Sequence, residues 1–168
     1  WHLDSIRDAS FSPDGSKIVT ASADETARIW DATTGAAISG PLRHSRALDR
    51  AIFSADGSKA LITSWDNTAQ VWDIATGKAI GERLHHELFV KAAVFSPDGS
   101  KVVTASQTTA QVWDSATGRP LYDPIRNENF VENLNFSPDG SKIVIANFAR
   151  TAQVWDASNG KPIGRPLQ

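Results

Sequence analysis

Histidine, aspartate and serine recur at fixed distances from aromatic residues in the first half of the chain. Each histidine stands nine residues before a phenylalanine, and each aspartate stands six residues before a tryptophan. The two sets are His2, Ser22 and Asp24, and then His44, Ser64 and Asp66. These residue types form the catalytic triad of serine hydrolases. Because catalytic triads are not normally repeated in every unit of a chain, the repetition favours a structural network, and we expect no catalytic residue.

The tripeptide His85-His86-Glu87 contains residue types that bind metals. In an extended segment the side chains of His85 and His86 point to opposite sides, whereas a catalytic zinc site needs three convergent ligands. We therefore expect no metal site and no cofactor. Because the sequence also lacks a phosphate-binding loop, a nucleophile elbow and an HExxH motif, we do not expect an enzyme.

The bulk composition is that of an ordinary globular protein. The 168 residues are 40% hydrophobic and 21% charged, with a net charge of −2 and no cysteine. The charge balance and the short apolar runs give no reason to expect a nucleic-acid or membrane partner. No secretory signal is visible, so we expect a cytoplasmic protein. The chain does not begin with methionine, which suggests a fragment, a processed product or a trimmed chain.

One ten-residue pattern occurs four times along the chain. TARIWDATTG, which begins at Thr26, returns in closely related form at Thr68, Thr109 and Thr151. The tryptophans in these copies, Trp30, Trp72, Trp113 and Trp155, are separated by 42, 41 and 42 residues. A second series, Phe11, Phe53, Phe95 and Phe136, is followed each time by Ser-Pro-Asp-Gly or Ser-Ala-Asp-Gly. A fixed period of this length indicates a repeat architecture.

Each repeat predicts four short strands and no helix. Strand A ends at the phenylalanine, the Asp-Gly turn leads into strand B (KIVTAS in the first repeat), and strand C contains the tryptophan. Strand D follows a second glycine turn and has apolar residues four apart, at Ile38/Leu42, Ile80/Leu84, Leu121/Ile125 and Ile163/Leu167. Five prolines fall in strand D, which places it at the sheet edge because proline cannot donate to a ladder.

Repeated four-stranded units of this length are typical of propeller blades. The FSPDGSK segments, the Trp-Asp pairs and the ATG-type turns resemble the WD-repeat (tryptophan–aspartate repeat) β-propeller family over essentially the whole chain. The resemblance implies an all-β fold and a single domain, residues 1–168. Its four blades span about 1–43, 44–85, 86–126 and 127–168.

The resemblance also implies a hydrogen-bonded tetrad in each blade. Its members are a histidine before strand A, a serine or threonine in strand B, an aspartate in the B–C turn and the strand-C tryptophan. By position they are His2, Ser22, Asp24 and Trp30 in blade 1, His44, Ser64, Asp66 and Trp72 in blade 2, His86 and Trp113 in blade 3, and Trp155 in blade 4. A one-residue deletion removes the aspartate of blade 3, while Asn127 and Ala149 replace histidine and aspartate in blade 4. We predict that His44→Ala destabilises the fold by ~1–3 kcal/mol, because it leaves Asp66 unpaired.

Function in the family is found on the rims and in the central channel. The rim positions that the resemblance points to include four aromatic residues, Trp65, Phe89, Phe130 and Phe148, and four charged residues, Arg7, Asp49, Lys91 and Glu132. The aromatic residues form a binding patch if exposed, or pack against neighbouring loops if buried. The charges alternate in sign from blade to blade and either pair at the channel mouth or form only a solvated rim. The strand-A phenylalanines are expected to pack between sheets.

Four blades are an unusual number, because the resemblance implies rings of seven or eight. We expect either a homodimer that closes an eight-bladed ring or further blades in a longer parent chain, with a closed four-blade ring as a third alternative. The implied function is a non-enzymatic scaffold or sensor module that binds a protein or peptide on the rim. The alternatives are a self-assembling propeller half without a separate ligand, and a small-ligand or catalytic site in the channel.

Overall fold

The structure, a computed structural model, describes all residues 1–168 and consists of four four-stranded antiparallel sheets without a helix. In each sheet the strands lie side by side in sequence order. Blade 1 contains β1 (Ile6–Phe11), β2 (Lys17–Ser22), β3 (Thr26–Asp31) and β4 (Leu42–Arg43), and blade 2 contains β5 (Leu48–Phe53), β6 (Lys59–Ser64), β7 (Thr68–Asp73) and β8 (Ala79–His85). Blade 3 contains β9 (Ala92–Phe95), β10 (Lys101–Ser106), β11 (Thr109–Asp114) and β12 (Ile125–Arg126), and blade 4 contains β13 (Val131–Phe136), β14 (Lys142–Asn147), β15 (Ala152–Asp156) and β16 (Pro162–Leu167). The predicted fold class is confirmed.

The Asp-Gly hairpin between the first two strands forms as its sequence predicts. In blade 1, Gly15 has a φ of 71° and its N–H donates to the carbonyl of Ser12 at 2.8 Å. Asp14 accepts hydrogen bonds from the Ser12 hydroxyl at 2.6 Å and from the Ser16 N–H at 3.0 Å. These bonds hold the pKa of Asp14 well below its usual range. The hairpin is therefore fixed by local hydrogen bonds before any packing between blades.

The outer strand varies between blades. β4 and β12 contain only two residues each, and isolated bridges Trp30↔Ala37 and Trp113↔Pro120 continue their pairing. β8 and β16 run the full length and carry a bulge, with Gly81 and Gly164 at φ of 65° and 69°. The predicted edge position is confirmed, and Pro162 and Pro166 lie within edge strand β16.

The hydrophobic core lies between neighbouring blades. Each blade has a leading face, which carries the strand-A phenylalanine and the strand-C tryptophan, and a trailing face on the opposite side. Between blades 1 and 2, the leading face of blade 2 (Ala51, Phe53, Ala60, Ile62 and Trp72) packs on the trailing face of blade 1 (Val19, Ala21, Ala27, Ile29 and Leu42). The same arrangement recurs between blades 2 and 3 and between blades 3 and 4. Stability in such an array comes mainly from these interfaces between neighbours.

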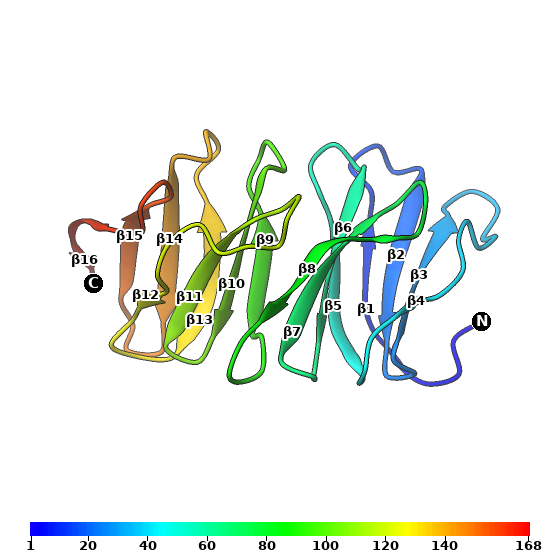
Figure 1. Cartoon of the computed structure of the whole chain (residues 1–168), viewed down its shortest axis with the longest axis horizontal. Helices are drawn as coiled ribbons and strands as arrows, with labels where there is room; N and C mark the ends of the chain where they lie inside the picture. Colours follow the sequence, from blue (N-terminus) through cyan, green and yellow to red (C-terminus); the bar gives the residue numbers. More distant parts are fainter.

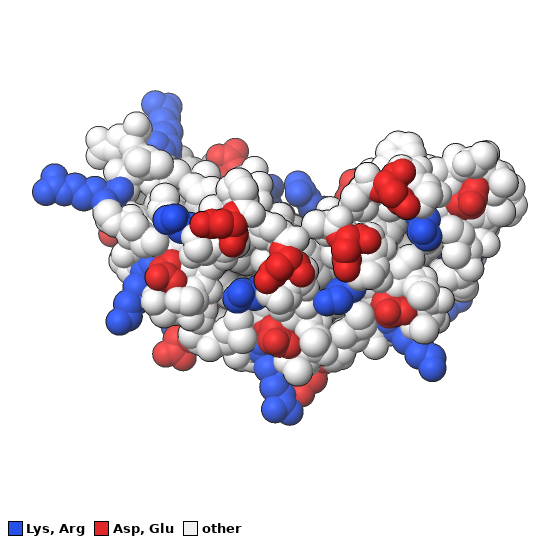
Figure 2. Space-filling view, turned by 90° about the horizontal axis from the view of Figure 1, so that it is seen from above, with Lys and Arg blue, Asp and Glu red and all other residues white.

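The four blades form an open arc and not a closed ring. Figure 1 shows them in a row with the two chain termini at opposite ends. Seen from above, the molecule is a crescent with one hollowed side, and acidic and basic side chains are interspersed on the face turned to the viewer (Figure 2). The expectation that all strand-A phenylalanines pack between sheets is therefore wrong for Phe11, which is 66% exposed on the uncovered face of blade 1. The third alternative, a closed four-blade ring, is also wrong, because blades 1 and 4 lie at opposite ends of the row.

Candidate functional site

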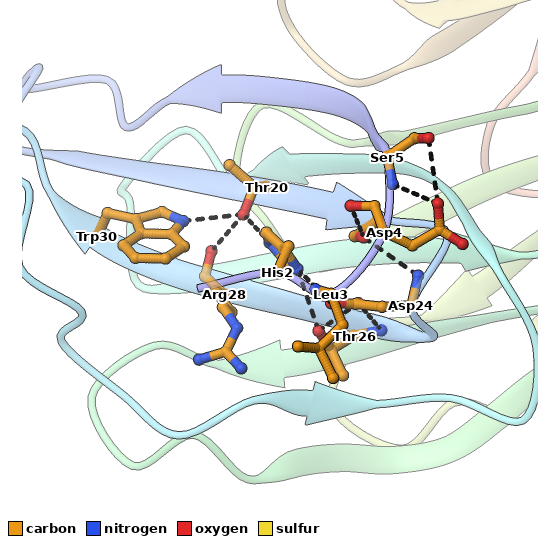
Figure 3. Close-up of polar contacts among 10 residues, drawn as sticks. His2, Leu3, Asp4, Ser5, Thr20, Asp24, Thr26, Arg28 and Trp30 are labelled. Atoms are coloured by element: carbon orange, nitrogen blue, oxygen red, sulfur yellow. Dashed lines mark hydrogen bonds and ion pairs between the residues drawn. The ribbon is translucent and has the colours of Figure 1, made fainter.

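The tetrad of blade 1 is complete, and its hydroxyl comes from Thr20 (Figure 3). The Trp30 indole N–H donates to Thr20 Oγ1 at 2.8 Å, and His2 Nε2 lies 2.7 Å from the same oxygen. On the other side of the ring, His2 Nδ1 lies 3.0 Å from Asp24 Oδ2. Because a carboxylate only accepts, Nδ1 carries the proton, and in the neutral imidazole Nε2 accepts from the Thr20 hydroxyl.

The prediction that Ser22 supplies the tetrad hydroxyl is wrong. Ser22 lies at the end of β2, two residues beyond Thr20, where its hydroxyl donates to the Asp4 carbonyl at 3.1 Å and accepts from the Asp24 N–H at 3.1 Å. Ser64 occupies the equivalent place in blade 2 and accepts from the Asp66 N–H at 3.2 Å. These serines fix the B–C turn and form no hydrogen bond with the histidines. Sequence position alone could not separate two hydroxyl residues on the same face of one strand.

The side chains of the blade 1 network are buried and hydrogen-bonded to one another. The side chains of His2 and Asp24 are 4% and 6% exposed. Burial on its own raises the pKa of Asp24, but hydrogen bonds from Thr26, Leu3 and His2 outweigh it and hold that pKa well below its usual range. The Thr20 hydroxyl is already bonded to both His2 and Trp30. The arrangement is that of a satisfied buried network that joins β2, β3, the turn between them and the segment before β1.

In blade 2 the tetrad lacks its hydroxyl, because Ile62 stands where blade 1 has Thr20. Both residues pair with the same position of the third strand, Thr20 with Arg28 and Ile62 with Gln70. The ring centroids of His44 and Trp72 are 6.0 Å apart, as are those of His2 and Trp30. Both ring nitrogens of His44 and the indole nitrogen of Trp72 are buried without a hydrogen-bond partner. The tetrad geometry is therefore retained while its hydrogen bonds are lost.

In blade 2, Asp66 forms an ion pair with Arg83, whose Nη1 lies 3.4 Å from Asp66 Oδ2. His44 Nδ1 is 4.0 Å from the same oxygen, beyond hydrogen-bond distance. Burial lowers the pKa of His44 to about 4, so this histidine is neutral at pH 7. The reason given for the His44→Ala prediction is therefore wrong, since Asp66 keeps Arg83 and the Thr68 hydroxyl, 2.6 Å from its Oδ1, without His44.

In blade 3 the tetrad keeps its hydroxyl but lacks its aspartate. His86 Nε2 and the Trp113 indole nitrogen lie 2.6 Å and 2.7 Å from Thr104 Oγ1, as in blade 1. The deletion shortens the B–C connection to a tight turn in which Ser106 pairs directly with Thr109, so no aspartate reaches the histidine. A cavity of 210 Å³ lies beside His86, lined also by Gln107, Thr108 and Arg126. Burial lowers the pKa of His86 to about 4.

Blade 4 retains only the tryptophan of the tetrad. Ile145 occupies the hydroxyl position, and the Trp155 indole nitrogen and Asn127 Nδ2 are buried without partners. Threonine therefore alternates with isoleucine at this position, as Thr20, Ile62, Thr104 and Ile145. All four sheets form nevertheless.

The candidate rim aromatics lie in a row across blades 2 to 4, which we call the aromatic rim (Trp65, Phe89, Phe130 and Phe148). Trp65, Phe130 and Phe148 are 48%, 53% and 61% exposed, while Phe89 is partly buried. The rings of Trp65 and Phe89 meet edge to face with centroids 5.7 Å apart. The Phe148 N–H donates to the Phe130 carbonyl at 3.1 Å, so the two phenylalanines of blade 4 are held side by side.

Three members of the aromatic rim, Phe89, Phe130 and Phe148, line a hollow between blades 3 and 4. This apolar hollow has a volume of 350 Å³ and is lined by Leu88, Phe89, Phe130, Val131 and Phe148, with Lys91 and Gln107 as its polar members. A second, more polar hollow of 610 Å³ adjoins it through Phe89 and Lys91 and extends to Trp65, Arg7 and Asp49. An apolar pocket with a few polar groups at its edge is the usual form of a binding site for a side chain.

The predicted pairing of the alternating charges is wrong. No ion pair forms among Arg7, Asp49, Lys91 and Glu132. Arg7 instead lies over Trp65, with its guanidinium carbon 4.8 Å from the ring centroid, a cation–π contact. Arg7, Asp49 and Lys91 line the polar hollow, whereas Glu132 lines neither hollow. The first three therefore remain candidate binding residues beside the aromatic rim.

Sequence reasoning missed two structural roles. The aspartate of each Trp-Asp pair caps the next turn: Asp31 accepts from the N–H groups of Thr33 and Thr34 at 3.0 and 2.7 Å. The glutamine of TAQVWD links strands within its own blade and is buried in blades 2 and 3. In blade 2, Gln70 Nε2 donates to the carbonyls of Val71 and Ile80. Both roles could have been predicted, because a polar residue that recurs at the same place in each repeat indicates a structural role.

No group of three or more histidine, cysteine, aspartate or glutamate side chains is arranged to hold a metal ion. The structure also contains no helix with the length and hydrophobicity that a membrane span needs.

Comparison with known families agrees with this architecture. The model of the family described as WD domain, G-beta repeat, matches residues 1–31, 42–73 and 77–114. These ranges cover more than half of the chain, which therefore belongs to the WD-repeat family. Blade 4 lies outside the matched ranges and is the blade that has lost three tetrad members. A search of curated proteins found no match. WD repeats commonly mediate protein–protein interactions and are generally non-enzymatic.

Proposed function

We propose that this chain is a non-enzymatic interaction module that binds an extended segment of a partner protein on its aromatic rim. The observation that carries the proposal is the apolar hollow formed by Phe89, Phe130 and Phe148, three aromatic residues that the repeat pattern does not require. The tetrads and the interblade core use other residues. Exposed aromatic residues gathered around one hollow are typical of binding surfaces in proteins that recognise proteins.

The surroundings of the hollow favour a particular kind of segment. A bulky apolar side chain fits the 350 Å³ volume, since aromatic and aliphatic anchors fill such pockets in protein interfaces. Lys91 stands at the edge of both hollows, and Arg7 and Arg50 line the polar one with Asp49. The net positive character of Arg7, Arg50 and Lys91 against Asp8 and Asp49 favours an acidic residue next to the apolar anchor.

Selection from a displayed library of random short peptides tests this proposal. We expect the wild-type chain to enrich peptides with an aromatic or large aliphatic residue beside an acidic residue. The variant Phe148→Ser should weaken the binding of an enriched peptide at least about tenfold, because it removes an exposed wall of the hollow. Charge reversal at Lys91 should shift the preference away from acidic neighbours.

The matched control is Leu121→Ser, which removes an exposed apolar side chain that lines neither hollow, at the outer edge of blade 3. This variant should bind the enriched peptide like the wild type. The proposal is overturned if no peptide class is enriched, or if Phe148→Ser and Leu121→Ser bind equally well.

A further inference from the structure

The two ends of the arc expose the two halves of a blade interface. On blade 1 the leading face is uncovered, and its residues are Ile6, Ala9, Phe11, Ile18 and Trp30. On blade 4 the trailing face is uncovered, and its residues are Val144, Ala146, Ala152, Val154 and Leu167. Inside the chain, a leading face of this composition always packs on a trailing face of this composition.

Side chains on the two end faces are far more exposed than the side chains at equivalent positions inside the arc. Ile6 is 56% exposed, whereas the residues at its place in the other blades, Leu48, Val90 and Val131, are at most 2% exposed. On the other end, Leu167 is 57% exposed, whereas Leu42, Leu84 and Ile125 are at most 2% exposed. Neither end carries the polar outer face that a terminal repeat uses to remain soluble.

The third strand of blade 1 also differs from that of the other blades. Arg28 stands where the other blades have Gln70, Gln111 and Gln153, which bond to carbonyls of their own blades. The Arg28 Nε is buried and has no partner within the chain. Blade 1 therefore lacks the bond from side chain to carbonyl that each of the other three blades makes within itself.

We propose that a second copy of this chain covers both faces, so that two arcs join head to tail in a closed ring of eight blades. The leading face of each copy packs on the trailing face of the other, which makes two equivalent interfaces related by the two-fold axis of the ring. One chain cannot join its own faces, because they lie at opposite ends of the row (Figure 1). The crescent shape of Figure 2 directs both ends toward the hollowed side, as closure with a second crescent requires.

Two charge substitutions test the pairing of these faces. The wild-type chain should have a solution mass twice its 18.1 kDa in light scattering on a sizing column. Phe11→Glu places a charge in the leading face and Val144→Lys places one in the trailing face, and both sites are solvent-exposed in the single chain. Each variant alone should raise the dimer dissociation constant at least about a hundredfold, because both interfaces of its ring bury a charge in apolar surroundings.

An equimolar mixture of the two variants should form the dimer again. In the mixed ring one interface combines both substitutions, so that glutamate and lysine meet, while the other interface is entirely wild type. A symmetric contact of leading face with leading face would give no such rescue. Leu121→Glu, an exposed apolar position on neither end face, is the control and should remain dimeric.

Circular dichroism distinguishes loss of the dimer from loss of the fold, since a variant that keeps its β-sheet spectrum as a monomer has lost only the contact. A monomeric wild-type chain would overturn the proposal. A wild-type trimer or open polymer would overturn the eight-bladed ring, and failure of the variants to complement each other would overturn the head-to-tail arrangement.

Discussion

Restoring the missing hydroxyl of blade 2 should stabilise the protein. In wild type, Ile62 fills the place of the tetrad threonine, and His44 and Trp72 bury ring nitrogens without partners. The substitution Ile62→Thr puts a hydroxyl between them, in a site whose ring separation of 6.0 Å equals that of the intact tetrad. We expect the indole N–H of Trp72 to donate to this hydroxyl and the hydroxyl to bond to His44, as Thr20 does in blade 1.

The magnitude follows from two opposing contributions. Ile62 is fully buried, so trimming it to the size of valine or threonine costs ~0.5–1.5 kcal/mol. Each buried polar atom that gains a partner recovers ~1–3 kcal/mol. Two such atoms, Trp72 Nε1 and a ring nitrogen of His44, share one new hydroxyl whose own burial also costs free energy, so we count a single recovery of ~1–3 kcal/mol. Subtracting the cost of trimming Ile62 leaves a net stabilisation of up to ~2 kcal/mol.

Urea unfolding followed by circular dichroism measures this change as a shift of the midpoint at constant slope. Ile62→Val is the matched control, because it has the shape of threonine without the hydroxyl and should destabilise by ~0.5–1.5 kcal/mol. In a Trp72→Phe background, which removes the indole donor, the advantage of threonine over valine should shrink. The reasoning is refuted if Ile62→Thr is no more stable than Ile62→Val.

Two further predictions concern the outer strand and the buried histidines. Gly81→Ala should destabilise the protein by ~2 kcal/mol or more, because the added Cβ would overlap the Thr117 backbone of blade 3. The control Gly164→Ala has a similar positive φ but open space around it, and should cost only ~1 kcal/mol. Equal losses of the two variants in urea unfolding would contradict the packing argument. His44 and His86 have pKa values of about 4 in the folded protein, so the unfolded chain takes up protons first as pH falls below its histidine pKa of about 6.5. Stability should therefore be full above that pH and decline by up to ~3 kcal/mol per histidine on acidification to pH 4. A melting temperature that does not change between pH 7 and pH 5 would contradict this, and His86→Gln should reduce the decline.

The sequence was sufficient to predict the features that the repeat imposes locally. The Asp-Gly hairpins, the strand order and the edge position of strand D all follow from residue types at fixed places, such as Gly15 and Pro166. The features that sequence reasoning missed depend on spacing between side chains. Ser22 and Thr20 lie on one face of β2, and only the distance to Trp30 shows which hydroxyl joins the tetrad. Likewise, the alternating signs of the rim charges suggest an ion pair for Arg7, whereas its guanidinium lies over the ring of Trp65.

The four tetrads together show what specifies a blade in this chain. Blade 1 has the complete network, blade 2 lacks the hydroxyl, blade 3 lacks the carboxylate, and blade 4 has lost all but Trp155, yet each forms the same four-stranded sheet. What all four share is the Asp-Gly hairpin, the aspartate-capped turn after the tryptophan and the alternation of apolar faces. Turn chemistry and burial between blades therefore suffice to build a blade, and the tetrad adds stability to a sheet already specified. Because burial between blades carries the fold, the uncovered faces of blades 1 and 4 are its weakest places, and covering them should stabilise the chain more than repairing any tetrad.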